Sequence, residues 1–527
     1  MSSAKEPVTR RFGNGLTVLI KEDKSHPVVS LQYWVGTGSM NEGHWQGSGL
    51  SHLLEHLVFK GTAHFSGQEL ARKVQERGGH WNAYTSVNRT VYYIDGPAES
   101  WQIFLNLLTE LVFFPTFPED EMEREKEVVR REMAMYADDP DSVAYQLLMQ
   151  TLYLKHPCRW PVLGERAAFD CLTRQDVLDY HASRYVPNNV VLSIAGDVDA
   201  AEILSHLEVL VEDLKSRPLN REPIPHEPHQ FGSRRVRKEF AVPYSKLHLA
   251  WRLPCSAHPD TPALSALSSI LGGGRSARFY EKFHDRLGLV YSIEVHSNQS
   301  ETDEGAFTIS MDVDRAQRDK VRDMVLQELR NLAEEDFTED LKRVCKQTRV
   351  SRLRRRSSAS GVASEMGADW FGSRNLNLSS EWQEAIERVT TEDLHRVCST
   401  WLSSPNVTEV SLDPPGSNAG DEERASASAG TALSEHVLGN GMKVVIREDH
   451  RLPLAYACMA FKAGCRAENE HDAGVTDLMS ECLLKGTSTR SAADIARFLE
   501  DIGGAINTST GNNSLSVGCQ VLAEDLD

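Results

Sequence analysis

The feature that most constrains the fold of this 527-residue chain is a long internal repeat. The start of the chain recurs in its C-terminal part, and from Gly49 onward the two copies align without a gap at a constant offset. The matching segments are residues 12–20 with 438–446, Lys60-Gly61-Thr62 with Lys485-Gly486-Thr487, and Gly78-Gly79 with Gly503-Gly504. A repeat this long is a duplicated multi-domain unit rather than a solenoid, and the chain length also calls for several domains.

Strand-like and helix-like patterns alternate within the first repeat unit, and the same order of patterns occurs twice in it. Residues 28–35 alternate like a strand, residues 50–59 are apolar at helical spacing, and residues 101–113 and 119–135 are longer helical patterns. A similar order reappears over residues 246–412. Strand pairs mixed with helix pairs predict an α+β fold, in which each domain is a mostly antiparallel sheet with helices packed on one face.

These patterns predict three domains and a linker. We expect a first α+β domain over residues 1–222 and a second domain of the same fold over residues 223–412. Residues 413–432 are rich in Pro, Gly, Ser, Ala and acids without periodicity, which indicates a linker. Residues 433–527 are then a degenerate and incomplete copy of the first domain, because this copy stops before most of the helices that the first domain has.

Composition and charge argue against several classes of protein. The formal net charge of −19 argues against nucleic-acid binding, which needs a concentrated basic surface. No stretch approaches the ~20 apolar residues that a membrane span needs, and the N-terminus has no apolar signal core. The nine cysteines are scattered without a Cys-x-x-Cys pair, which is typical of free thiols in a reducing compartment. We therefore expect a cytoplasmic protein, with an organellar matrix as the alternative.

Three residues in the stretch SHLLEHL, which begins at Ser51, carry the chemistry: His52, Glu55 and His56. The two histidines are four residues apart in a helical pattern, so their imidazoles project from one face, one turn apart. Imidazoles placed in this way can both reach one Zn²⁺ at about 2.0–2.1 Å. Glu55 lies beside them, where it can act as the general base on a metal-activated water. We expect one Zn²⁺ per chain.

A catalytic zinc site also needs a third protein ligand and an open position. Glu132 is the candidate third ligand, on the second of the two long helical patterns. Glu125 lies seven residues earlier, so two turns of helix put both carboxylates on one face. We expect Glu125 to have a catalytic supporting role, in which it positions a histidine or the water.

The residue pattern by itself leaves other interpretations of His52, Glu55 and His56 open. With 19 histidines in the chain, a chance His-x-x-Glu-His has a probability of about one in twenty. Two helix histidines can also form a polar core pair or a solvated face. The flanking apolar residues indicate a largely buried helix, however, where two imidazoles and a carboxylate are costly unless a metal compensates them. A structural zinc site normally uses four protein ligands and favours cysteine, and no cysteine lies near His52 or Glu132 in the sequence.

His-x-x-Glu-His is the inverted-zincin signature, and nearly all of the chain resembles the pitrilysin/insulinase family of zinc metallopeptidases, which includes mitochondrial processing peptidase-like proteins. The separation between His56 and Glu132 is similar to that of the family's distal glutamate, and Glu125 is similar to its accessory carboxylate. Other similar segments are residues 78–85, 90–93 and 287–291. The resemblance implies a clamshell of two halves, each with two similar α+β domains, that encloses peptides extended along a strand edge beside the zinc. Its implied substrate-binding residues are Asn82, Ala83, Tyr84 and Tyr291.

The chain departs from the family pattern at two places. Asp477, Ser480 and Glu481 stand where the first copy has its His-x-x-Glu-His residues, so the second copy resembles the inactive half that closes the chamber. Tyr291 has His284 seven residues before it, where active halves are often complemented by an arginine and tyrosine pair at that spacing. The alternative for Tyr291 is a packed strand tyrosine.

We therefore predict a zinc-dependent endopeptidase that hydrolyses unfolded or short peptides held in a closed chamber. The closing half would come from a missing C-terminal region or from a partner chain. The alternative is a non-catalytic scaffold or processing-complex subunit of the same fold. Such subunits have usually lost their metal ligands, whereas the first copy here keeps all of them.

Overall fold

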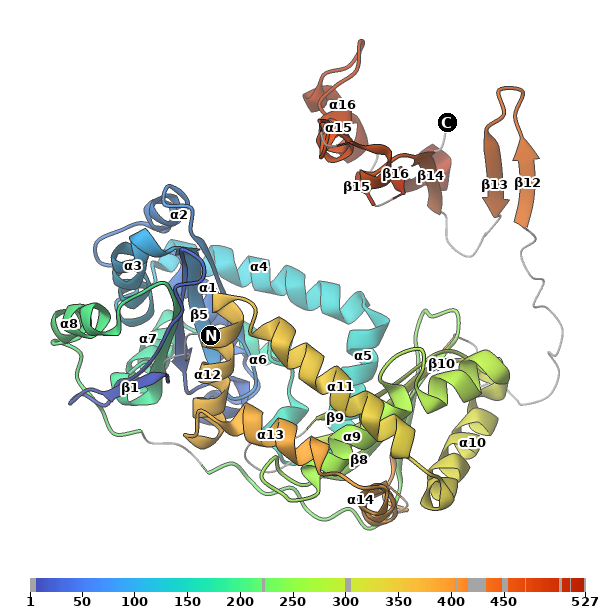
Figure 1. Cartoon of the computed structure of the whole chain (residues 1–527), viewed down its shortest axis with the longest axis horizontal. Coiled ribbons are helices and arrows are strands. Elements are labelled where there is room, and N and C mark those ends of the chain that lie inside the picture. Colours follow the sequence, from blue (N-terminus) through green and yellow to red (C-terminus); the bar gives the residue numbers. More distant parts are fainter. Residues whose placement is uncertain are drawn as a thin grey trace. The chain divides into compact units, whose positions relative to one another are not determined.

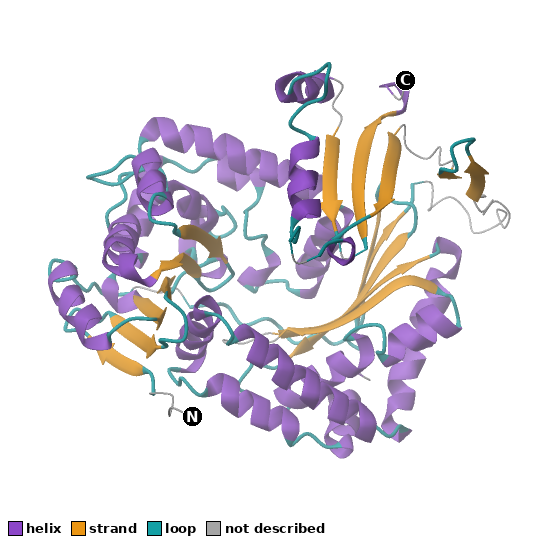
Figure 2. Ribbon diagram, turned by 45° about the horizontal axis from the view of Figure 1, so that its top comes forward, coloured by secondary structure: helices purple, strands orange, loops and turns teal. Residues whose placement is uncertain are grey.

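The computed structural model describes residues 6–219, 223–298, 305–402, 405–415, 433–447, 454–469, 471–501, 505–511 and 513–525. The chain divides into two compact units, Met1–Ala419 and Gly420–Asp527 (Figures 1 and 2). Most of the predicted linker, residues 416–432, lies outside the described residues, as do Gly503 and Gly504 of the repeat. Within the described residues, no helix is both long enough and apolar enough to cross a membrane.

Six strands form the first sheet of the larger unit. In order across the sheet they are β1 (Val8–Arg11), β2 (Thr17–Glu22), β6 (Val190–Gly196), β3 (Val28–Val35), β5 (Thr90–Pro97) and β4 (His80–Thr85). Neighbouring strands are antiparallel, except that β2 and β6 are parallel. Among the described strands β4 pairs only with β5, so it forms one edge of the sheet.

The apolar faces of several helices cover one side of this sheet and form its main core. These helices are α1 (Leu50–Val58), α2 (Gly67–Gln75), α3 (Trp101–Phe113), α4 (Glu119–Asp138), α6 (Arg166–Asp170), α7 (Arg174–Arg184) and α8 (Ala200–Leu210). Alternate residues of β3, such as Leu31 and Tyr33, point into this core, because successive side chains of a strand point to opposite faces.

A second sheet of five strands follows in the same unit. In order across the sheet they are β7 (Arg234–Glu239), β11 (Thr408–Asp413), β8 (Ser245–Leu253), β10 (Gly305–Val313) and β9 (Val290–Asn298). Its helical layer contains α9 (Thr261–Gly272), α10 (Arg318–Asn331), α11 (Thr338–Arg355), α13 (Leu378–Glu387) and α14 (Thr391–Val397). Figure 2 shows these helices beside the long strands. The predicted α+β class is confirmed by this architecture. Asp413, which the sequence places in the linker, is instead the last residue of β11 and is buried.

One helix from each half of this unit packs on the sheet of the other half, which the sequence patterns do not predict. The exchanged helices are α5 (Pro140–Leu152) and α12 (Ala359–Ser373). Leu148 of α5 packs against Val410 of the second sheet, and Met366 of α12 packs against Trp34 of the first. Each sheet is therefore covered on both faces, by its own helices on one side and by a borrowed helix on the other. Residues 1–222 and 223–412 supply one sheet each but are interlocked by these helices.

The smaller unit repeats the start of the first sheet. Its elements are β12 (Leu433–Val437), β13 (Lys443–Arg447), β14 (Leu454–Lys462), α15 (Val475–Leu483), α16 (Ala492–Asp501), β15 (Ala505–Thr510) and β16 (Ser514–Leu522). The described strands form a β12–β13 hairpin and a sheet in the order β14-β16-β15. By the sequence repeat, α15 corresponds to α1 and β15 to β4, whereas no described element of this copy corresponds to α4.

Candidate metal centre

Helix α1 carries His52, Glu55 and His56, and its amphipathic pattern explains why they come together. Its leucines and Val58 are buried in the core of the first sheet, whereas the three polar residues are only partly buried. The helix begins after Gly49, whose φ of 72° lies in the left-handed region that glycine adopts without strain. A Cβ atom at this position would lie 2.0 Å from the carbonyl oxygen of Leu163, so this tight approach also requires glycine.

The N-terminus of α1 has no side-chain cap of its own, and Glu42 takes that place. Glu42 is fully buried, and its Oε1 accepts a hydrogen bond from the backbone N–H of Ser51 at 2.8 Å. The Ser51 hydroxyl in turn contacts the hydroxyl of Tyr180 at 2.8 Å. A carboxyl oxygen at this end of a helix satisfies one of the free backbone N–H groups. This buried network fixes the backbone immediately before His52.

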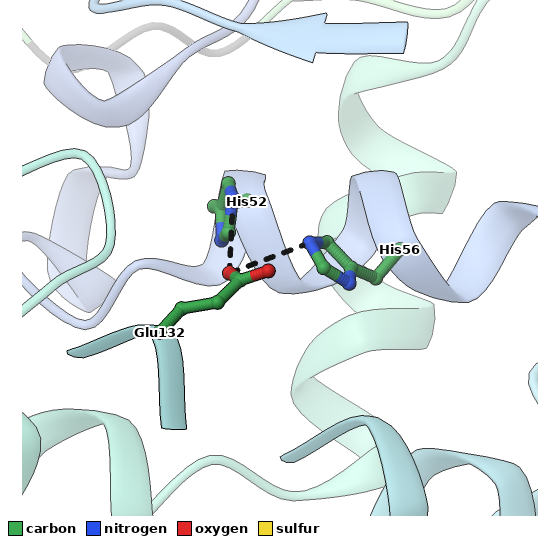
Figure 3. Close-up of side chains that lie close together, drawn as sticks. All are labelled: His52, His56 and Glu132. Carbon is green, nitrogen blue, oxygen red and sulfur yellow. Dashed lines mark ion pairs between the residues drawn. The ribbon is translucent and has the colours of Figure 1, made fainter. Parts of the chain in front are cut away.

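Glu132 reaches the two histidines from α4, which packs beside α1 (Figure 3). Its Oε2 atom lies 3.9 Å from Nε2 of His52 and 3.8 Å from Nε2 of His56. One donor atom from each of the three residues lies within 4.8 Å of the other two. Ligands around a tetrahedral zinc ion are about 3.3 Å apart, so small side-chain movements would bring these atoms to that spacing. Two imidazole nitrogens and one carboxylate oxygen, with Glu132 one-third exposed, fit a catalytic zinc site that has an open position.

The state of His52 suits a metal ligand. Burial, and to a smaller extent the nearby His56, lowers the pKa of His52 to about 4. The imidazole is therefore neutral at physiological pH, and a neutral imidazole has a nitrogen lone pair to give to a metal. No other group of three or more His, Cys, Asp or Glu residues in the described part of the chain is placed to hold a metal ion.

Glu125 holds His56 from the side opposite to Glu132. Nδ1 of His56 lies 3.1 Å from one oxygen of Glu125, and Nζ of Lys60 lies 2.6 Å from the other. Burial opposes charge on both partners, but their mutual contact prevails: it raises the pKa of His56 and, together with Lys60, lowers the pKa of Glu125. A carboxylate that binds Nδ1 fixes the ring so that Nε2 faces the metal position, which is the arrangement commonly found behind ligating histidines.

Glu55 belongs to the site but not to the group of three donor atoms. One of its carboxylate oxygens accepts a hydrogen bond from the Thr85 hydroxyl at 2.5 Å. Burial raises the pKa of Glu55, and the negative charge of Glu132 adds to this rise, while Thr85 and His56 oppose it. A carboxyl group of raised pKa next to a metal position is suited to taking up and returning a proton.

The predicted substrate-binding residues lie on two different sheets. Asn82, Ala83 and Tyr84 lie on the edge strand β4, which contacts α1, and Tyr84 is well exposed. Tyr291 lies on β9 of the second sheet, where its exposed ring packs against Tyr244 at a centroid distance of 5.3 Å. Among the described side chains, no hydrogen bond, ion pair or ring contact joins Tyr291 to the His52 cluster. The substrate-binding role of all four residues stays a prediction. Asn82, Ala83 and Tyr84 lie on a strand next to α1, whereas Tyr291 lies on the second sheet.

In the degenerate copy, α15 carries Asp477, Ser480 and Glu481 in place of the three residues of α1. Asp477 accepts a hydrogen bond from Thr510, the residue equivalent to Thr85, at 2.9 Å. Glu468, the equivalent of Glu42, accepts backbone hydrogen bonds from Gly474 and from Thr476 at the start of α15. The copy therefore retains the local scaffold of the site without the histidines.

The comparisons with known proteins agree with this geometry. The family described as insulinase (peptidase family M16) matches residues 17–166 and 443–527, and the peptidase M16 inactive domain matches residues 172–347. Together the two matches cover most of the chain. This chain belongs to peptidase family M16. The five site residues on α1 and α4 all lie in the first match and outside the inactive-domain match: His52, Glu55, His56, Glu125 and Glu132.

Individual relatives of this M16 chain carry matching names. An uncharacterized zinc protease of Rickettsia felis is 27% identical over 75% of this chain and 94% of its own length. The uncharacterized zinc protease YmxG of Bacillus subtilis is 27% identical over 73% of this chain and 92% of its own length. The crystal structure of a protease from Helicobacter pylori superposes with a TM-score of 0.71 and 26% identity, over 78% of this chain and all of that one.

Sequence reasoning did not assign roles to Glu42, Lys60 or Thr85. Each had a signal in the internal repeat, because Glu468, Lys485 and Thr510 stand at the equivalent positions of the second copy. The second copy has lost the histidines. The residues that it shares with the first copy are therefore expected to support the helix rather than to bind metal. The positions that are identical in the two copies include these three residues among others.

The contact of Glu132 with both histidines predicts its role in metal binding. We expect Glu132→Ala to weaken zinc binding by at least about 10–100-fold, the range already seen when an outer partner of a metal ligand is lost. Zinc content is measured by elemental analysis after dialysis against a chelator. Glu123→Ala, on an exposed position of the same helix, is the matched control and should keep its zinc. Unchanged zinc content in Glu132→Ala would remove this residue from the site.

Burial of Glu42 predicts a pH dependence of stability. Burial raises the pKa of Glu42 from 4.5 to about 8, although hydrogen bonds from the Ser51 region oppose this. Between these two values the folded protein holds a proton that the unfolded chain has lost, so the free energy of unfolding falls as the pH rises. Thermal unfolding between pH 5 and pH 8 should show a steeper loss of stability in the wild type than in Glu42→Gln. Parallel profiles for the two proteins would contradict the raised pKa.

Proposed function

We propose that this chain is a zinc-dependent endopeptidase that hydrolyses unfolded or short peptides. The observation that carries the proposal is the convergence of His52, His56 and Glu132 from two helices, with Glu55 beside them but outside the donor group. One Zn²⁺ per chain would be held by these three residues. The zinc proteases among its relatives and the M16 family match support this choice of metal and reaction.

A bound zinc ion would polarise the scissile carbonyl and increase the acidity of a water molecule. Glu55 would accept the proton of that water on a carboxylate oxygen and then deliver it to the nitrogen of the leaving amine. The raised pKa of Glu55 favours the proton-bearing state that lies between these two transfers. Glu125 would keep His56 oriented throughout through its contact with Nδ1.

The substrate would lie along β4 as an added strand. The outer edge of β4 pairs with no other described strand, and its last residue contacts Glu55. An extended peptide can add to such an edge through main-chain hydrogen bonds, which bind peptides of many sequences. Asn82, Ala83 and Tyr84 would then contact the substrate. A chamber that admits only unfolded or short peptides would be closed by further polypeptide, in this chain or in a partner.

The alternative of a non-catalytic subunit finds less support in the residues. The inactive-domain match covers residues 172–347, whereas the residues of the proposed site lie between Glu42 and Glu132. The degenerate copy illustrates how a lost site looks in this chain, with a carboxylate and a serine where His52 and Glu55 stand in the first copy. The first copy has none of these losses.

Replacement of the proposed general base tests the function. We expect Glu55→Gln to keep its zinc but to lose nearly all hydrolysis of a quenched fluorescent peptide, because the amide cannot accept the proton of the water. The matched control is Glu481→Gln, in the degenerate copy, which should be as active as the wild type. A chelator should abolish wild-type activity, and added zinc should restore it. Wild-type activity in zinc-loaded Glu55→Gln would disprove the assignment.

A further inference from the structure

Thr85 stands at the junction of the edge strand and the helix that carries the histidines. It is the last residue of β4 and pairs with Thr90 of β5 in the sheet register. Its hydroxyl donates a hydrogen bond to Oε2 of Glu55 at 2.5 Å. The position of Glu55 is therefore set by the sheet as well as by its own helix.

Such a contact matters because a glutamate side chain is flexible. Fixing a free side chain of this type costs conformational entropy. Thr85 holds one carboxylate oxygen at a fixed place, so this cost is met on folding rather than during the reaction. A charged acceptor also makes a hydrogen bond that is stronger than one between neutral groups. The hydroxyl of Thr85 is thus placed to keep Glu55 in one orientation relative to His56 and Glu132.

The degenerate copy shows which part of the Thr85 contact is common to both copies and which part depends on Glu55. Thr510 remains at the end of β15, but its hydroxyl binds Asp477, which occupies the place of His52. Ser480, which occupies the place of Glu55, receives a hydrogen bond from Thr508 on its backbone oxygen at 3.3 Å. The strand–helix contact is therefore general to both copies, whereas its use to hold the carboxylate of Glu55 is particular to the first.

We propose that Thr85 is a positioning residue that orients Glu55 for proton transfer through its hydroxyl group. This proposal rests on the proposed function, because it assigns a purpose to Glu55 as the general base. Thr85 itself would not touch the reacting atoms. Its effect would be on the rate of the chemical step and not on zinc binding or on the affinity for the peptide.

The test compares Thr85→Val, which replaces the hydroxyl by a methyl group of similar size, with Thr85→Ser, which keeps a hydroxyl. In zinc-loaded protein we expect Thr85→Val to lower kcat for a quenched peptide by about 10–100-fold, the usual effect of removing a supporting hydrogen bond near a metal site. KM and zinc content should stay near their wild-type values. Thr85→Ser should recover most of the wild-type kcat, and Thr510→Val, in the degenerate copy, should be as active as the wild type.

Thr85→Ala provides a second variant without the hydroxyl, and it should lose as much kcat as Thr85→Val if the fold of β4 is undisturbed. Crystal structures of the two variants should show the Glu55 carboxylate moved from its wild-type place. A wild-type kcat in either variant, or an equal loss in Thr85→Ser, would overturn the role of Thr85. A displaced Glu55 together with equal activities of wild type and Glu55→Gln would instead contradict the proposed function and leave the contact itself intact.

Discussion

The site depends on the burial of one short helix. Helix α1 buries its leucines in the core of the first sheet and thereby presents its polar side toward α4. Removing side chains of this size from water contributes roughly 1.5–3 kcal/mol each, so the orientation of the helix about its own axis is strongly determined. His52 and His56 then face the same position on the side of α4. Glu42 secures the N-terminal end of this helix, and Thr85 secures the side that faces the edge strand.

The exchange of helices explains why the second sheet belongs to the site although it contributes no donor atom. Helix α4, which carries Glu125 and Glu132, ends at Asp138, and Asp139 caps the following helix α5 (Figure 1). Helix α5 packs on the second sheet, so the C-terminal end of α4 is anchored there. In return, α12 covers the outer face of the first sheet through its contact with Trp34. Helix α4 thus packs beside α1 in the core of the first sheet and continues into a helix that packs on the second sheet.

The sequence predicted the parts of this site that follow from helical periodicity. Spacings of four and seven residues placed His52 with His56 and Glu125 with Glu132, and the structure brings the two pairs together. The crossing of helices could not be predicted, because an amphipathic pattern shows that α5 and α12 bury a face but not which sheet receives it. Tyr291 stays a prediction: it lies on β9 of the second sheet, and the pattern of its own segment does not show where that strand lies relative to the His52 cluster. Lys60 and Thr85 act through contacts between elements far apart in sequence, which no local spacing encodes.

The central claim is that His52, His56 and Glu132 hold one zinc ion. Anomalous diffraction from crystals of the zinc-loaded protein, recorded on both sides of the zinc absorption edge, tests it most directly. The account predicts one anomalous peak at about 2.0–2.2 Å from Nε2 of each histidine and from a carboxylate oxygen of Glu132, with Glu125 in contact with His56 but not with the metal. A zinc peak that lies away from these three residues, or a fully zinc-loaded crystal with no peak between them, would contradict it.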